Sequence, residues 1–239
     1  MADRARRAAT PDAGRIRLPD PTALEAGELS KSARTRTRIM EAAVECLAVT
    51  GYAGTTTTTV AQRAGLTRAA MLYHFPSRMA LLEAVIYYVT RRRNEKYMAA
   101  MEGIPRGAGF YGAVIDKAWE QTGTSEFKAF SELAAAARTD MELAAIFGPA
   151  MAEYDRVRRQ AAQELFPQEM IDKPWFNLRR DVARFLVEGL AQQQDALSFN
   201  ADGRRQAILD FLKALETTEE GRALMARLAR GTGGGRDRG

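Results

Sequence analysis

Side chains that could carry out metal or nucleophilic chemistry are scarce in this chain of 239 residues. It contains one histidine, His74, and one cysteine, Cys46. Zinc sites and Cys–His catalytic sets need several such groups, so the composition argues against an enzyme, a metal site or a cofactor. A single cysteine also excludes an internal disulfide framework and fits a reducing, cytoplasmic location. Cys46 falls within an apolar helical stripe, where we expect it to be part of the core.

The distribution of charge points instead to contact with a polyanion. The whole chain carries a net charge of +5, made up of +7 in residues 1–100 and −2 in residues 101–239. A basic N-terminal part predicts binding to nucleic acid or to an anionic membrane surface. No apolar run approaches the roughly 18 residues that a membrane-spanning helix requires. We therefore expect no membrane partner of that kind.

The elements that position these charges are expected to be helices throughout. Apolar residues recur every three to four positions between two irregular tails, and alternating strand patterns are absent. Residues 1–31 contain three prolines and are expected to form a disordered basic arm, and residues 231–239 a flexible tail. The first helix is expected over about residues 32–49, with Gly51 ending it. Its first turns carry Arg34, Arg36 and Arg38.

Residues 55–74 have the pattern of a helix-turn-helix. A short helix is expected to end near Ala64, Gly65 provides the turn, and Thr67 caps the next helix. Apolar contacts between the two helices come from Val60, Leu66 and Met71. Such spacing alone also fits any tight helical hairpin.

The residues around the motif favour a DNA-binding helix-turn-helix over an ordinary helical hairpin. Gly51-Tyr52, the threonine run, Val60 to Thr67, Tyr73 to Arg78 and Leu81-Leu82 follow one another in order. Over about residues 32–90 the chain resembles the TetR (tetracycline-repressor-like) family of bacterial transcription regulators. The resemblance implies an all-α fold with a three-helix DNA-binding domain over 32–92 and a helical effector-binding and dimerisation domain over 93–230. It also implies a homodimeric repressor that a small-molecule effector releases from a palindromic, double-stranded operator.

The resemblance assigns the DNA contacts to both helices of the motif. Thr67, Arg68 and Ala69 open the recognition helix, and Arg68 would read guanine or bind phosphate. Thr56 or Thr57 starts the preceding helix, where a hydroxyl suits phosphate or simple capping. The further candidates are Tyr73, His74, Arg78 and Arg36. Two positions depart from many relatives, which have glycine in place of Ala69 and tyrosine in place of Leu72.

The body after residue 93 offers less specific signals. Breaks in the helical pattern are expected at Gly123, Gly148-Pro149, Pro167, Pro174 and residues 201–203. Bulky apolar groups that could line an effector cavity, or simply form core, are Trp119, Phe127, Phe130, Phe147 and Tyr154. Asp116 and Glu120 share a helix face and could hold a cationic ligand or lie at the surface.

The last long helices favour association between subunits. Apolar stripes run along both, and the candidates for a dimer interface are Val182, Phe185, Leu186, Gly189 and Phe211. Burial within one subunit is the alternative. Two other classes of protein fit the sequence less well than a DNA-binding regulator. An enzyme with a helical body would need a catalytic set, and none is evident. A membrane-surface protein would not need the turn-and-cap pattern.

Overall fold

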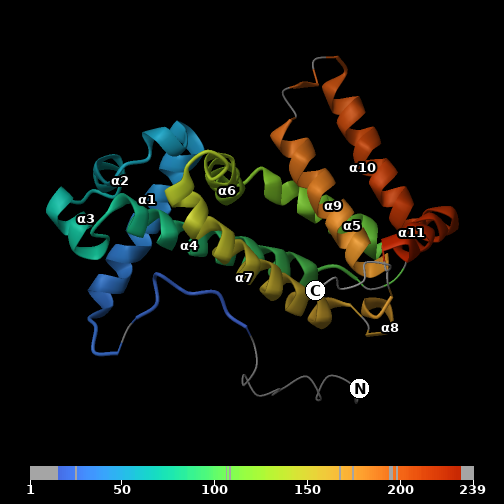
Figure 1. The fold of residues 1–239 in the computed structure, drawn as a ribbon, viewed down its shortest axis with the longest axis horizontal. Coiled ribbons are helices and arrows are strands. Elements are labelled where there is room, and N and C mark those ends of the chain that lie inside the picture. Colours follow the sequence, from blue (N-terminus) through green and yellow to red (C-terminus); the bar gives the residue numbers. More distant parts are fainter. Residues whose placement is uncertain are drawn as a thin grey trace, which may run out of the picture.

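The computed structural model describes residues 16–232 apart from residues 25, 106, 108, 167, 174, 194–195 and 198. Within these residues every regular element is a helix, which confirms the expected all-α fold (Figure 1). The helices are α1 (Ser30–Gly54), α2 (Thr57–Arg63), α3 (Arg68–His74), α4 (Arg78–Glu102), α5 (Phe110–Thr122), α6 (Ser125–Ala136), α7 (Met141–Leu165), α8 (Gln168–Ile171), α9 (Trp175–Gln192), α10 (Ala201–Thr217) and α11 (Glu219–Thr232).

Helix α1 is longer than the predicted first helix because the chain resumes a helical turn after a kink. Gly51 has φ +70° and ψ −177°, so the helix is interrupted at the glycine that was expected to end it. Only glycine adopts such a conformation without strain. The cysteine Cys46 is buried in the α1 stripe together with Ile39, Met40 and Leu47, in agreement with its predicted place in the core.

One apolar core joins the N-terminal helices to the first helices of the body. Buried side chains of α1, α2, α3 and α4 pack with Ala129, Phe130 and Leu133 of α6 and with Leu143 of α7. Helix α4 continues through the expected domain boundary between residues 92 and 93. In Figure 1, α4 and α7 run side by side from the N-terminal helices toward α5 and α9. The two parts are therefore packed against each other rather than joined by a linker.

The expected break at Gly148-Pro149 does not occur, because α7 runs through it. Pro149 cannot donate to the carbonyl of Ala145, but it is exposed, so water can solvate that carbonyl. Residues 201–203 are likewise the first turn of α10 instead of a break. Their neighbour Asn200 has positive φ and supplies the break one residue earlier.

The arm prediction is wrong for residues 16–20, which pack against α4 and α7 without forming a helix, and Pro21 and Glu28 are bound to Arg36 of α1. Leu18 is buried against Tyr154 and Val157 of α7, and the Ile16 amide donates to Gln160 Oε1 over 2.8 Å. Asp20 forms an ion pair with Arg91 of α4. Residues 1–15 and all but the start of the predicted 231–239 tail lie outside the described residues.

Candidate nucleic-acid interface

The first helix of the motif, α2, is fixed by a reciprocal cap. The Thr56 hydroxyl accepts from the Thr59 amide over 3.1 Å, and the Thr59 hydroxyl accepts from the Thr56 amide over 2.9 Å. This capping box satisfies two backbone donors that the helix itself leaves unpaired. Thr56 is therefore the cap and Thr57 the first helical residue, which resolves the choice left open by the sequence.

The turn between α2 and α3 depends on Gly65 and on an arginine from another helix. Gly65 has φ +64°, and the Leu66 amide donates to the Ala61 carbonyl over 2.9 Å. Arg38 of α1 donates through Nη2 to the Ala64 carbonyl at the end of α2. Sequence reasoning missed this role, because Arg38 and Ala64 are 26 residues apart.

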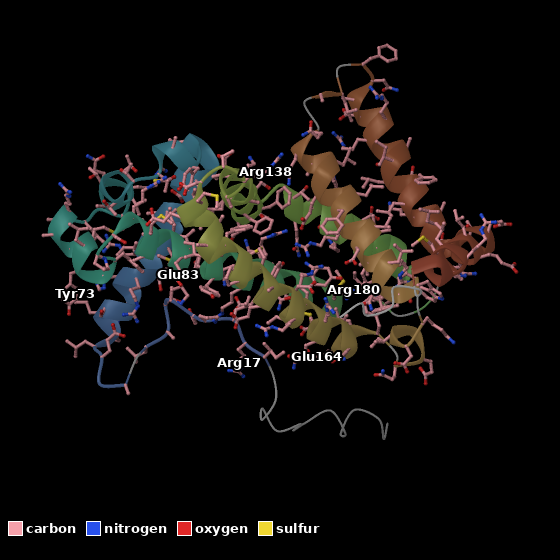
Figure 2. The ribbon with its side chains drawn as sticks, viewed as in Figure 1. Arg17, Tyr73, Glu83, Arg138, Glu164 and Arg180 are labelled. Carbon is pink, nitrogen blue, oxygen red and sulfur yellow. The ribbon has the colours of Figure 1, made fainter. Side chains whose placement is uncertain are left out.

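The recognition helix α3 presents its outer face to solvent. Thr67 caps it by accepting from the Ala70 amide over 3.1 Å, and Met71 anchors its inner face with no exposed surface. Thr67, Arg68 and Ala69 are exposed at the N-terminal end. Tyr73 is 83% exposed and lies at the outer end of the molecule in Figure 2. A helix anchored on one side and free on the other can enter a DNA groove without rearrangement of the core.

His74 ends α3 and is half-buried beside Tyr73, whose ring meets it edge to face with centroids 5.2 Å apart. Burial lowers the pKa of the His74 imidazole, and the nearby positive charge of Arg36 lowers it further. The imidazole is therefore neutral at neutral pH, and it offers DNA a hydrogen-bonding group instead of a charge.

Two of the predicted DNA contacts are engaged inside the protein. Arg36 donates to Glu28 Oε2 over 2.8 Å and to the Pro21 carbonyl over 2.8 Å, so it fastens the arm to α1. Arg78 donates to the carbonyls of Thr55 and Tyr52 over 2.8 and 2.7 Å. Their guanidinium groups already have acceptors within the fold, which argues against the phosphate contacts expected of both.

Tyr52 links the motif to the body, a role that the sequence did not reveal. Its hydroxyl donates to Asp140 Oδ2 over 2.6 Å, and its amide donates to Glu132 Oε2 over 3.2 Å. Asp140 also caps α7 by accepting from the Leu143 amide. The Arg78 guanidinium lies 4.2 Å from the centre of the Tyr52 ring. A movement of α6 or α7 would therefore act directly on the segment that precedes α2.

The predicted pocket residues do not form one site. Phe127 lines a cavity between α4, α5, α7 and α9, and Tyr154 is buried behind it. Phe130 and Phe147 belong to the core shared with α1, and Trp119 packs against Ile115. The acidic pair is at the surface, with Asp116 bound to Lys213 and Glu120 bound to Lys117.

The predicted dimer residues divide between the inside and the outside of the subunit. Val182 and Leu186 pack partly against the cluster of Ile115, Val187, Leu209 and Leu212. Phe185 on α9 is 64% exposed and Phe211 on α10 is 59% exposed. A side chain added at Gly189 would meet no atom within 4 Å.

The part of the chain that the structure describes holds no cluster of three or more His, Cys, Asp or Glu side chains that could bind a metal ion. None of its helices combines the length and apolar character needed to cross a bilayer.

Comparisons with known proteins agree with this geometry. Residues 39–85 match the family model described as bacterial regulatory proteins, tetR family. Uncharacterized HTH-type transcriptional regulators of Mycobacterium tuberculosis and Mycobacterium bovis are 27% identical over 140 residues, covering 56% of this chain and 72% of theirs. The fold resembles a Rhodococcus sp. protein assigned to TetR-family regulators, with a TM-score of 0.53, 22% identity and coverage of 76% of this chain and 98% of the other. It also resembles a Pseudomonas aeruginosa PAO1 protein assigned as a transcriptional regulator, with a TM-score of 0.55, 20% identity and coverage of 84% and 98%.

Proposed function

Because this chain is a DNA-binding transcriptional regulator of the tetR family, we propose that it is a homodimeric repressor that a small-molecule effector releases from a palindromic operator. The observation that carries the DNA part of the proposal is the free outer face of α3, with Thr67, Arg68 and Tyr73 in solvent. Arg68 at the N-terminal end is placed to reach base edges or phosphate, and Tyr73 at the other end to reach phosphate.

The operator is found by sequencing genomic fragments that the purified protein retains. Binding of the recovered site is then measured at one fixed salt concentration for the wild type, Arg68→Ala and Tyr73→Phe. Arg68→Ala is expected to weaken specific binding by about tenfold to a hundredfold if it reads a base. Tyr73→Phe is expected to weaken binding to every sequence, because a phosphate contact carries no base information.

Arg156→Ala is the matched control, because Arg156 is exposed on α7, away from α3. Unchanged affinity of both the Arg68 and Tyr73 variants would refute the assignment of the outer face of α3 to DNA.

The dimer part of the proposal is supported by the apolar surface that α9 and α10 leave uncovered. Phe185 and Phe211 expose more than half of their surface. Exposing such large apolar side chains to water does not stabilise a monomer, and neighbouring exposed apolar groups are typical of an interaction surface. Gly189 lies on the same helix as Phe185, with open space around its Cα. Two copies packed through these helices would bury the rings and place two α3 helices on one DNA face, with half-sites about 34–36 Å apart.

The dimer is tested by Phe185→Glu and Phe211→Glu. Because both side chains are exposed within one subunit, a charge there is expected to leave the helical content unchanged while it separates the subunits. Met141→Glu is the control, since Met141 is also an exposed apolar residue, at 81%, but begins α7. Sedimentation should give monomers for the two phenylalanine variants and a dimer for the control. A dimer with normal operator affinity in all three would place the interface elsewhere.

A further inference from the structure

The cavity between α4, α5, α7 and α9 has an unusual lining for an apolar helical body. It encloses about 110 Å³ and is lined by five arginines and three carboxylates as well as aromatic and aliphatic groups. In Figure 2, Arg180 lies where α9 passes the C-terminal half of α7. Its Nη2 donates to the Arg158 carbonyl over 3.4 Å, which brings the two arginines to the same wall.

The carboxylates of the lining do not neutralise all of these arginines. Glu188 is shared by Arg93, at 2.7 Å, and Arg184, at 3.5 Å. Asp155 is bound by Arg159 at 2.6 Å, and Arg159 does not line the cavity. Asp181 forms no ion pair with any described residue, although its negative charge acts on the neighbouring Arg180. The lining therefore keeps an excess of positive charge.

Neither Arg158 nor Arg180 of the lining forms an ion pair with a carboxylate of the described residues. The polar contacts of Arg158 are with the Tyr154 hydroxyl, 3.3 Å away, and through its carbonyl with Arg180. Arg180 also donates to Asn177 Oδ1 over 3.5 Å and lies 5.9 Å from the centre of the Phe176 ring. Burial lowers the pKa of the Arg180 guanidinium, and the positive charge of Arg158 lowers it further. The negative charges of Asp181 and Asp155 offset part of this effect, and Glu188 acts in the same way on Arg158. The two guanidinium groups are nevertheless close enough to influence each other and could share one anionic group.

Arg93 and Arg184 add two buried donors at the same cavity. Arg93 Nη1 has no hydrogen-bond partner among the described residues, and Arg184 Nε has only the 3.5 Å ion pair with Glu188. A buried donor without an acceptor is costly, and an anion that entered the cavity would relieve that cost.

The rest of the lining is aromatic and apolar. The rings of Tyr111 and Phe166 are stacked with an interplanar angle of 3°, and Phe127 closes another side. The Arg158 guanidinium lies 5.0 Å from the centre of the Tyr97 ring. Stacking on a ring holds a guanidinium plane in place while its edge stays available for a bidentate bond.

We propose that this cavity binds a small organic carboxylate whose apolar part is about the size of one six-membered ring, with Arg158 and Arg180 holding the carboxylate. This assignment rests on the proposed function, since the carboxylate would be the effector. The size is taken from the volume of about 110 Å³, which is of the same order as the roughly 150 Å³ of a cavity that accepts benzene. The charge follows from the two unpaired guanidinium groups, which match the planar fork of a carboxylate.

The proposal is tested by isothermal titration of the purified full-length protein without DNA. Benzoate and 3-phenylpropionate are compared with benzamide, benzylamine and phenyl phosphate at one fixed salt concentration. At least one of the two carboxylates is expected to bind about tenfold or more tightly than the neutral amide, and benzylamine is expected not to bind. Preference for the amide or the amine would overturn the charge assignment, and preference for phenyl phosphate would overturn the carboxylate assignment.

Variants then locate the site. Arg158→Met and Arg180→Met keep much of the apolar stem and are each expected to weaken carboxylate binding by about tenfold or more. Arg180→Lys keeps the charge but not the fork and is expected to fall between Arg180→Met and the wild type. Arg156→Met is the matched control on α7, and circular dichroism checks that each variant is folded. Full carboxylate affinity in folded Arg158→Met and Arg180→Met would overturn the proposal.

Operator release is measured separately, so that the two proposals can fail independently. A carboxylate that binds the wild type but not Arg180→Met, without changing operator affinity, would support the cavity assignment and refute its role as an effector. Release of DNA by benzamide but not by the carboxylates would support effector control and refute the carboxylate.

Discussion

Replacing Gly65 by alanine tests whether the turn sets the position of the recognition helix. Gly65 has φ +64°, and an L-residue in this left-handed region costs about 1–2 kcal/mol. A Cβ at this position would lie 3.3 Å from Arg38 Nη2, which is already bound to the Ala64 carbonyl. The added methyl group therefore strains the backbone and also presses on the bond that closes α2.

The expected result for Gly65→Ala is a lower free energy of unfolding by about 1–2 kcal/mol and a melting temperature lower by about 2–8 °C. Operator affinity should fall as well, because α3 can relieve the strain only by changing its angle to α2. Gly65→Asn is the control, since asparagine tolerates the left-handed region better than alanine. Urea denaturation followed by circular dichroism gives the stability, and fluorescence anisotropy on labelled operator gives the affinity.

A double-mutant cycle separates the two causes. In an Arg38→Met background the contact with the new Cβ is lost, so Gly65→Ala should cost less there than in the wild type. Equal stability of the wild type, Gly65→Ala and Gly65→Asn would refute the argument that this turn requires positive φ.

The remaining predictions concern the arm, the histidine and the link between the motif and the body. Leu18→Ala should destabilise the protein by about 2–3 kcal/mol in urea denaturation because Leu18 is buried, whereas Ile16→Ala should change little because Ile16 is exposed. Burial lowers the pKa of His74 below 6.5, so the unfolded chain binds the proton more tightly. Stability should therefore fall as the pH drops below about 6.5, and a melting series between about pH 8 and pH 5 should be flatter for His74→Gln. Tyr52→Phe should cost about 0.5–1.5 kcal/mol through the lost bond to Asp140, and an unchanged urea midpoint would contradict that role.

The helix-turn-helix could be predicted from the sequence because its caps and its turn depend on residues that are close together in the chain. The caps of α3 and α4 at Thr67 and Ser77 involve backbone groups three residues away, and Gly65 marks a turn whatever surrounds it. The all-α fold class could be predicted for the same reason, because the spacing of apolar residues along the chain is also a local property. These features depend on neighbours in the chain and need no knowledge of tertiary contacts.

The parts that sequence reasoning missed depend on partners far away in the chain. Arg36 was expected to reach DNA, but its acceptors lie in the arm. Leu18 stands next to Pro19 and outside any helical apolar stripe, so nothing marked it as buried. The arginine-lined cavity was not predicted, because the sequence analysis expected bulky apolar residues to line an effector cavity. Arg180 and Arg184 stand four residues apart on the stripe of α9, and this spacing could have indicated a cationic face.

The packed arm also affects how the molecule is completed during synthesis. The Ile16 amide pairs with a side chain 144 residues later, so at about 5–20 residues per second the arm is made roughly 7–30 s before its partner exists. The caps of α2 and α3 need only neighbouring residues, and Arg38, which binds the turn, is made before it, so these elements can form in that interval. The arm can dock only when α7 has left the ribosome and packed on α4. The turn and caps of the helices that face DNA can thus form early, whereas their shared core with α6 and α7 is completed later and the arm docks last.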